Sequence, residues 1–153
     1  MNFIEKGKEN YFSFRGRLNR KAFWLRLVTV YVVMQVIGAA GAHLLAGMGH
    51  AAVVSYSLAV SFTFLLSQAS LWVRRFHDRN VSGYWYGIVF MFQMLALLIC
   101  IYAFSMKQDA LMMMGLLLLG IAALLWLYVL VRFGFTRGTK GANDYGADPL
   151  EEQ

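Results

Sequence analysis

Charged residues are scarce in this sequence: Asp, Glu, Lys and Arg make up 14% of its 153 residues. A soluble domain usually carries about a quarter charged residues, whereas 59% of the residues here are hydrophobic. A single core built from a chain of this length could not hide so much apolar surface from water. The composition therefore excludes an ordinary soluble domain and favours a protein that is solvated by lipid.

Proline and cysteine are rarer still, with one residue of each. A single cysteine, Cys100, excludes an intrachain disulfide, and its apolar neighbours indicate a packing residue rather than a reactive thiol. Aromatic residues make up 16% of the chain. This content excludes a disordered protein, because disorder requires low hydrophobicity.

Acidic residues are absent from four long apolar runs. Each run is close to the roughly 20 residues that cross about 30 Å of hydrocarbon as a helix. Short linkers force consecutive helices to lie antiparallel and adjacent. The sequence thus predicts an all-α fold, a single domain in which four transmembrane helices form an up-and-down bundle. The predicted spans are residues 22–46, 51–73, 84–105 and 111–131, between an N-terminal segment, 1–21, and a tail, 132–153.

The basic residues fall on one side of these spans. With the exception of Lys107, every Lys and Arg lies near the start of the first span, in the linker between the second and third spans, or in the tail. Because lysine and arginine mark cytoplasmic loops, we expect both termini in the cytoplasm. The net charge of +6 then serves to orient the protein in a membrane that contains anionic lipid. We therefore expect no nucleic-acid partner.

Small and polar residues recur in and before the spans. Ser55, Ala59, Thr63 and Ser67 are four residues apart, and this spacing predicts a face on which the second span packs closely against a neighbour. Asn19 stands before the first span, where its side chain is expected to cap the helix. Both features predict structure rather than chemistry.

Three segments on the basic side carry most of the remaining polar residues. They read YFSFRGRLNRKAFW (residues 11–24), RRFHDRNVSGYW (74–85) and GTKGANDYGADP (138–149). In content and order they resemble the bacterial inner-membrane family catalogued as domain of unknown function 805, over essentially the whole chain. One departure is Tyr84, where the family typically has Trp; here Trp85 follows. The resemblance implies a multi-pass protein of the bacterial inner membrane, and it implies no activity.

Helical geometry predicts which side chains of the middle segment meet, if the second helix continues past residue 73. Arg74 and Asp78 are four residues apart, as are Arg75 and Arg79, and residues at this spacing are neighbours on a helix. The pattern predicts an Arg74–Asp78 ion pair. It also leaves Arg75 facing Arg79, which requires an anion between them.

Turn-forming residues dominate the rest of the two later segments. We expect a turn at Ser82 and Gly83, capped by Asp78 or Ser82. The tail should be a loop with specific backbone demands, and its acids are candidate partners for arginines of the other segments. The tail residues expected to form this structure are Asn143, Asp144, Gly146 and Asp148.

Three functions are compatible with these segments. One is an ion-pair clasp that ties both tails to the linker, in a structural or accessory subunit of a larger membrane complex. Another is an enzyme that uses His77 and Asp78, although a second histidine and a nucleophile motif are missing. The third is a module that binds or transports an anionic lipid or solute, because arginine suits bidentate phosphate contact. Its candidate residues are Arg15, Arg17, Arg20, Arg74, Arg75 and Arg79.

We predict the binding module, with the accessory subunit as the alternative. The spacing of a nucleotide-binding loop and the ligand order of a calcium loop are both missing from the tail. We therefore expect no enzyme activity, no cofactor and no metal. The expected partners are membrane lipids with anionic headgroups, together with a second copy of the chain or another membrane protein.

Overall fold

The computed structural model describes residues 3–151, and these residues contain helices and no β-strand. The predicted all-α fold is confirmed, and four of the helices are long and apolar enough to cross a membrane. In chain order the elements are α1 (Phe3–Phe12), α2 (Arg20–Leu45), the 3-10 turn η1 (Ala46–Met48), α3 (His50–His77), α4 (Tyr84–Ser105), α5 (Asp109–Val129) and the π-helical turn η2 (Leu130–Phe135).

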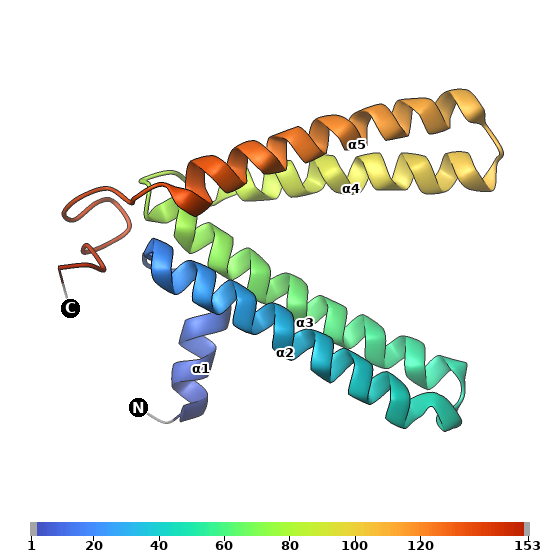
Figure 1. Cartoon of the computed structure of the whole chain (residues 1–153), viewed down its shortest axis with the longest axis horizontal. Coiled ribbons are helices and arrows are strands. Elements are labelled where there is room, and N and C mark those ends of the chain that lie inside the picture. Colours follow the sequence, from blue (N-terminus) through green and yellow to red (C-terminus); the bar gives the residue numbers. More distant parts are fainter. Residues whose placement is uncertain (1–2, 152–153) are drawn as a thin grey trace.

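The long helices form two antiparallel hairpins, α2–α3 and α4–α5, which diverge like the arms of a V (Figure 1). Helices within a hairpin pack along their length, whereas α3 and α4 contact each other little and separate beyond the linker that joins them (Figure 1). Large aromatic rings occupy the vertex. The ring of Trp126 meets Trp72 and Tyr86 edge-on, at centroid distances of 5.9 and 5.6 Å. The ring of Trp126 thus joins the two hairpins where they meet.

In the α2–α3 hairpin, a side chain caps the start of α2, and a glycine lets the two helices pack closely. Asn19 caps α2 as predicted, because its side-chain oxygen accepts a hydrogen bond from the Ala22 amide at 2.8 Å. A Cβ atom on Gly41 would lie 2.0 Å from the ring of Tyr56, so only glycine permits this approach. The predicted small-residue face on α3 is buried only toward the end of the helix. Ser67 is buried and Thr63 half-buried, whereas Ser55 and Ala59 are exposed.

The α4–α5 hairpin also depends on one glycine, which yields a testable prediction. A Cβ atom on Gly115 would lie 2.5 Å from the sulfur of Cys100, whereas one on Gly120 would meet nothing within 4 Å. We expect Gly115→Ala to lower the free energy of unfolding by about 1–3 kcal/mol through overpacking. Gly120→Ala is the matched control and should leave it unchanged or raise it. Thermal unfolding in detergent measures both, and equal melting temperatures would contradict this packing.

The buried core lies at the end of the molecule that carries both termini. Its members include Phe23, Trp72, Phe76, Tyr86 and Phe133, whereas the outer parts of the long helices expose many leucine, valine and methionine side chains. We call this end the basic face: it comprises α1, the chain from residue 13 through the first turn of α2, the last turn of α3 with the α3–α4 linker, and η2 with the tail from residue 136 to 151. The tertiary structure that could carry a function is concentrated there.

Candidate functional site

Arg75 lies at the centre of the basic face and is completely buried, with 0% of its surface exposed. Its guanidinium donates hydrogen bonds to the carbonyl oxygens of Phe133 at 2.6 Å and Leu18 at 3.1 Å. It also donates to the carbonyl of Thr136 and forms an ion pair with Asp78. One side chain of α3 thus joins the segment before α2, the end of η2 and the α3–α4 linker.

The carboxylate of Asp78 is shared by Arg75 and Arg17, and its Oδ1 lies 3.3 Å from the Arg17 guanidinium. The predicted Arg74–Asp78 pair is therefore wrong. Helix α3 ends at His77, so Asp78 is the capping residue and its carboxylate points to the other side of the helix from Arg74. Burial raises the pKa of Asp78, and the guanidinium groups of Arg75 and Arg17 oppose that shift.

Arg74 binds the end of α1 instead. It donates to the carbonyl oxygens of Glu9, at 3.1 Å, and Asn10, and the Ser70 hydroxyl donates to the carbonyl of Tyr11 at 2.6 Å. The last carbonyls of a helix have no partner within the helix, and they carry its negative partial charge. Arg74 therefore finds its counter-charge in a helix terminus rather than in a carboxylate.

The sequence predicted that Arg75 and Arg79 face each other with an anion between them, and the structure gives Arg79 acceptors within the protein. Its guanidinium donates to the Thr136 hydroxyl at 2.6 Å and to the carbonyl of Arg137 at 2.7 Å. Both arginines reach Thr136, Arg75 at its carbonyl and Arg79 at its hydroxyl, so acceptors of the protein lie between them. No additional counter-charge is required between them.

Arg17 holds the tail against the linker. Its side chain is 1% exposed, and it donates to the carbonyl oxygens of Thr139 and Gly141, both at 2.6 Å. A longer bond of 3.3 Å reaches the carbonyl of Gly146. We call Arg17, Arg74, Arg75 and Arg79 the arginine clasp. The planar guanidinium fork offers five donors against the three of a lysine, so one arginine can bind more backbone carbonyls.

The tail forms the loop that was predicted. The backbone groups of Asn143 and Gly146 bond each other in both directions, at 3.0 and 3.1 Å, and the Asn143 side chain donates to the carbonyl of His77 at 2.9 Å. The ring of Tyr145 stacks on His77 with a centroid distance of 3.9 Å. His77 therefore packs against the tail, while the neighbouring Asp78 faces the arginines.

The tail acids have other partners than predicted. Among the side chains that the structure describes, none forms an ion pair with Asp144 or Asp148. The Asp148 carboxylate accepts backbone N–H bonds from Gly141 at 3.1 Å and Leu150 at 3.0 Å. These bonds, that from Leu150 foremost, lower the pKa of Asp148. The side chain thus closes the tail loop on itself.

The turn before α4 lies at Ser82 and Gly83, as predicted. The Ser82 hydroxyl accepts the amide of Tyr84 at 3.3 Å, and a Cβ atom on Gly83 would lie 2.5 Å from the Val73 side chain. Asp78 takes no part in this cap, because its carboxylate is bound by the clasp.

The clasp uses four of the six arginines predicted to bind an anion and leaves Arg15 and Arg20. In the part of the chain that the structure describes, the Arg15 side chain has no hydrogen bond or ion pair. Arg20 is exposed and donates one bond, to the carbonyl of Phe135 at 3.2 Å. Two other cations that the sequence did not single out, Lys21 and Arg137, lie near Arg20. The sequence could have pointed to these two cations, because each stands in or directly beside one of the three polar segments of the basic side.

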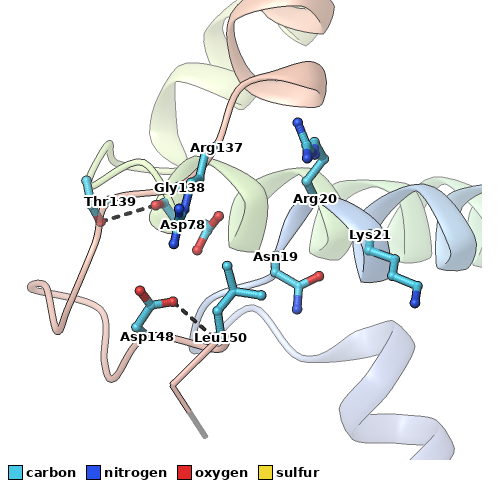
Figure 2. A pocket seen from close by; sticks show the side chains of 9 residues that line it. All are labelled: Asn19, Arg20, Lys21, Asp78, Arg137, Gly138, Thr139, Asp148 and Leu150. Carbon is cyan, nitrogen blue, oxygen red and sulfur yellow. Dashed lines mark hydrogen bonds between the residues drawn. The ribbon is translucent and has the colours of Figure 1, made fainter. Parts of the chain in front are cut away.

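Arg20, Lys21 and Arg137 line a cavity of about 310 Å³ between the start of α2, the end of α3 and the tail (Figure 2). Two carboxylates, of Asp78 and Asp148, line the same cavity. Within residues 3–151 the side chains of Lys21 and Arg137 have no hydrogen bond or ion pair. The other lining residues are Asn19, Gly138, Thr139 and Leu150.

The four clasp arginines and most of the residues that line the cavity lie within the region that matches a known protein family. The sequence profile of the family described as protein of unknown function (DUF805) matches residues 11–147. The chain belongs to the DUF805 family. No curated protein and no solved structure matches it.

The DUF805 match covers the whole arrangement described above. It runs from Tyr11, near the end of α1, to Ala147 in the tail, and so it includes the four clasp arginines. Four of the helices are long and apolar enough to cross a bilayer. This DUF805 protein is therefore an integral, multi-pass membrane protein whose two tails are tied together at one face.

Proposed function

We propose that this DUF805 protein binds the phosphate group of a phospholipid at its basic face, in the cavity beside Arg20, Lys21 and Arg137. The observation that carries the proposal is that some cationic side chains of the basic face form several hydrogen bonds within residues 3–151, whereas others form one or none. The clasp arginines are satisfied by protein carbonyls and Asp78, whereas these three exposed cations gather around one cavity.

The position of two of these cations supports an anionic ligand. Arg20 and Lys21 occupy the first turn of α2, where the helix dipole places positive partial charge. Cations in a first turn are unfavourable unless an anion lies close to them. A phosphate there would bind both side chains and complement the helix terminus.

Aromatic neighbours support a lipid rather than a solute. Arg20 and Lys21 also line a second, more open hollow of about 410 Å³ with Trp24 and Phe135. These two rings lie 5.0 Å apart, and the indole of Trp24 donates to the carbonyl of Gly134 at 3.0 Å. Tryptophan is enriched at headgroup depth in membranes, so the cations next to these rings are placed to meet lipid phosphate.

The proposal requires that the basic face meets the cytoplasmic leaflet, and the topology can be tested directly. We expect reporters fused before Asn2 and after Gln153, two points outside residues 3–151, to read as cytoplasmic. A reporter inserted at Gly49, between η1 and α3, should read as external, because the lysines and arginines lie on the other side. A cytoplasmic signal from Gly49 would overturn the four-span topology.

The binding site itself is tested by lipid retention. We expect Arg20→Ala, Lys21→Ala and Arg137→Ala each to weaken retention of phosphatidylglycerol by about tenfold, the value of one charge-assisted hydrogen bond. Native mass spectrometry of the purified protein measures it. Lys107→Ala, a cation at the opposite end, is the control and should change nothing.

Two further outcomes distinguish the alternatives. If soluble glycerol phosphate displaces the lipid at equal concentration, the ligand is an anionic solute and not a lipid. A variant that carries Arg20→Ala, Lys21→Ala and Arg137→Ala together provides the second outcome. If it keeps its lipid and its melting temperature, and a stoichiometric protein co-purifies with the chain, the site is not a lipid site. The accessory-subunit alternative would then replace it.

A further inference from the structure

We infer that the cavity selects a headgroup that carries an amine beside its phosphate, as phosphatidylethanolamine does, and that Asp148 binds the amine. This inference rests on the proposed phosphate site and names the class of lipid that it takes. The observation behind it is the mixed charge of the cavity, which holds two carboxylates as well as three cations.

The two carboxylates differ in how far their charge is compensated. Asp78 pairs with two arginines, one at each oxygen. Asp148 is 5% exposed. Arg17 and Arg137 act on its charge from a distance, and no side chain that the structure describes forms an ion pair with it. Each of its oxygens accepts one backbone N–H, and a carboxylate oxygen can accept a second donor. Asp148 is thus a buried carboxylate with room for a cation.

Two of the three cations lie on the other side of the cavity from Asp148, whereas the third, Arg137, belongs to the tail itself. Figure 2 shows Arg20 and Lys21 on the α2 side and Asp148 on the tail side. A headgroup with only negative charge would gain from the cations and be repelled by Asp148. A headgroup with both charges can place its phosphate near α2 and its ammonium near the tail. The low pKa of Asp148 keeps this carboxylate charged at neutral pH.

The amine must be able to donate hydrogen bonds, which separates two zwitterionic lipids. A primary ammonium offers three N–H donors, whereas the trimethylammonium of phosphatidylcholine offers none. The buried position of Asp148 favours the compact donor, because a hydrogen bond to a charged acceptor is strongest when water is excluded. The cavity of about 310 Å³ lies at the small end of the range for ligand sites, as expected for a headgroup.

The test is a competition between lipids with identical acyl chains. Native mass spectrometry of the full-length protein should show phosphatidylethanolamine retained about tenfold better than phosphatidylglycerol or phosphatidylcholine. Asp148→Asn, which keeps size and one acceptor oxygen, should abolish this preference. Asp144→Asn removes the same charge from an exposed position of the same tail and should preserve it.

A second measurement covers the case in which Asp148→Asn only prevents the tail from docking on the linker. Soluble phosphoethanolamine should slow tryptic cleavage after Lys140 in the wild-type protein, and glycerol phosphate should slow it less. If cleavage of Asp148→Asn is already fast without ligand, this wild-type comparison decides the inference. Equal protection by the two compounds would overturn it.

The two levels of the proposal fail differently. If Arg20→Ala and Lys21→Ala lower retention of every phospholipid while the wild type shows no preference for the amine, the phosphate site stands and the amine site is wrong. If these variants retain all lipids normally, the phosphate site is wrong and the inference falls with it.

Discussion

Replacing Asp78 with Ala should destabilise the protein more than any other single change at the basic face. Asp78 is the carboxylate shared by two buried arginines, and its loss leaves Arg75, with 0% exposure, without a counter-charge. Breaking a buried pair in this way costs about 3–5 kcal/mol. Thermal or denaturant unfolding in detergent, followed by tryptophan fluorescence, measures the loss.

Two comparisons make the Asp78 result specific. Asp144→Ala removes an exposed acid of the tail and should shift the free energy of unfolding by less than about 0.5 kcal/mol. A double-mutant cycle should give a coupling of about 0.5–3 kcal/mol between Asp78 and Arg75, and none between Asp78 and Arg74. Coupling to Arg74 alone would restore the four-residue pairing that the sequence suggested.

Replacing Gly138 with Ala should release the tail from the linker. A Cβ atom there would lie 2.2 Å from Oδ2 of Asp78 and 2.5 Å from its carboxyl carbon. Asp78 cannot move aside, because Arg17 and Arg75 fix both of its oxygens. The tail must shift instead, and overpacking of about 1–3 kcal/mol corresponds to roughly tenfold or more in the docked population.

The release is measured as the rate of tryptic cleavage after Lys140, which should rise about tenfold or more in Gly138→Ala. Ala142→Ser changes an exposed position of the same tail and serves as the control. The global melting temperature should fall less than in Asp78→Ala, because the Arg75 contacts to Leu18 and Phe133 persist. An unchanged cleavage rate would show that Gly138 does not lie against Asp78.

The sequence predicted the four long helices well because their signals are local, whereas α1 (Phe3–Phe12) was not predicted. Apolar length locates the four spans, and a capping side chain before an apolar run marks the start of α2 at Arg20. The ends were less accurate. Helix α3 continues to His77 and α5 passes into η2, because the buried contacts of the basic face extend both helices beyond their apolar stretches.

The partners of the arginines could not be predicted for a physical reason. Arg75 binds the carbonyls of Leu18 and Phe133, and backbone carbonyls are present at every residue, so they leave no mark in the sequence. Spacing along one helix suggests side-chain pairs within that helix. It cannot show that another helix terminus or loop offers better acceptors, as the end of α1 does for Arg74.

The separation of the two hairpins could not be predicted from the sequence either. A short linker between α3 and α4 favours close packing, and the residues at the vertex are ordinary for a membrane core. Trp72 of α3 and Tyr86 of α4 both meet the ring of Trp126 edge-on, so the hairpins contact each other through a few aromatic rings at one end. Only the three-dimensional contacts show this.

The V shape makes the protein a wedge in the plane of the membrane. Its cross-section is narrow in the leaflet at the basic face and broad in the opposite leaflet, where the tips of the two hairpins lie apart (Figure 1). A change in the angle between the hairpins therefore alters the area that the protein occupies in one leaflet far more than in the other. Lateral pressure and membrane curvature act directly on that angle, and its vertex is the linker that the arginine clasp holds.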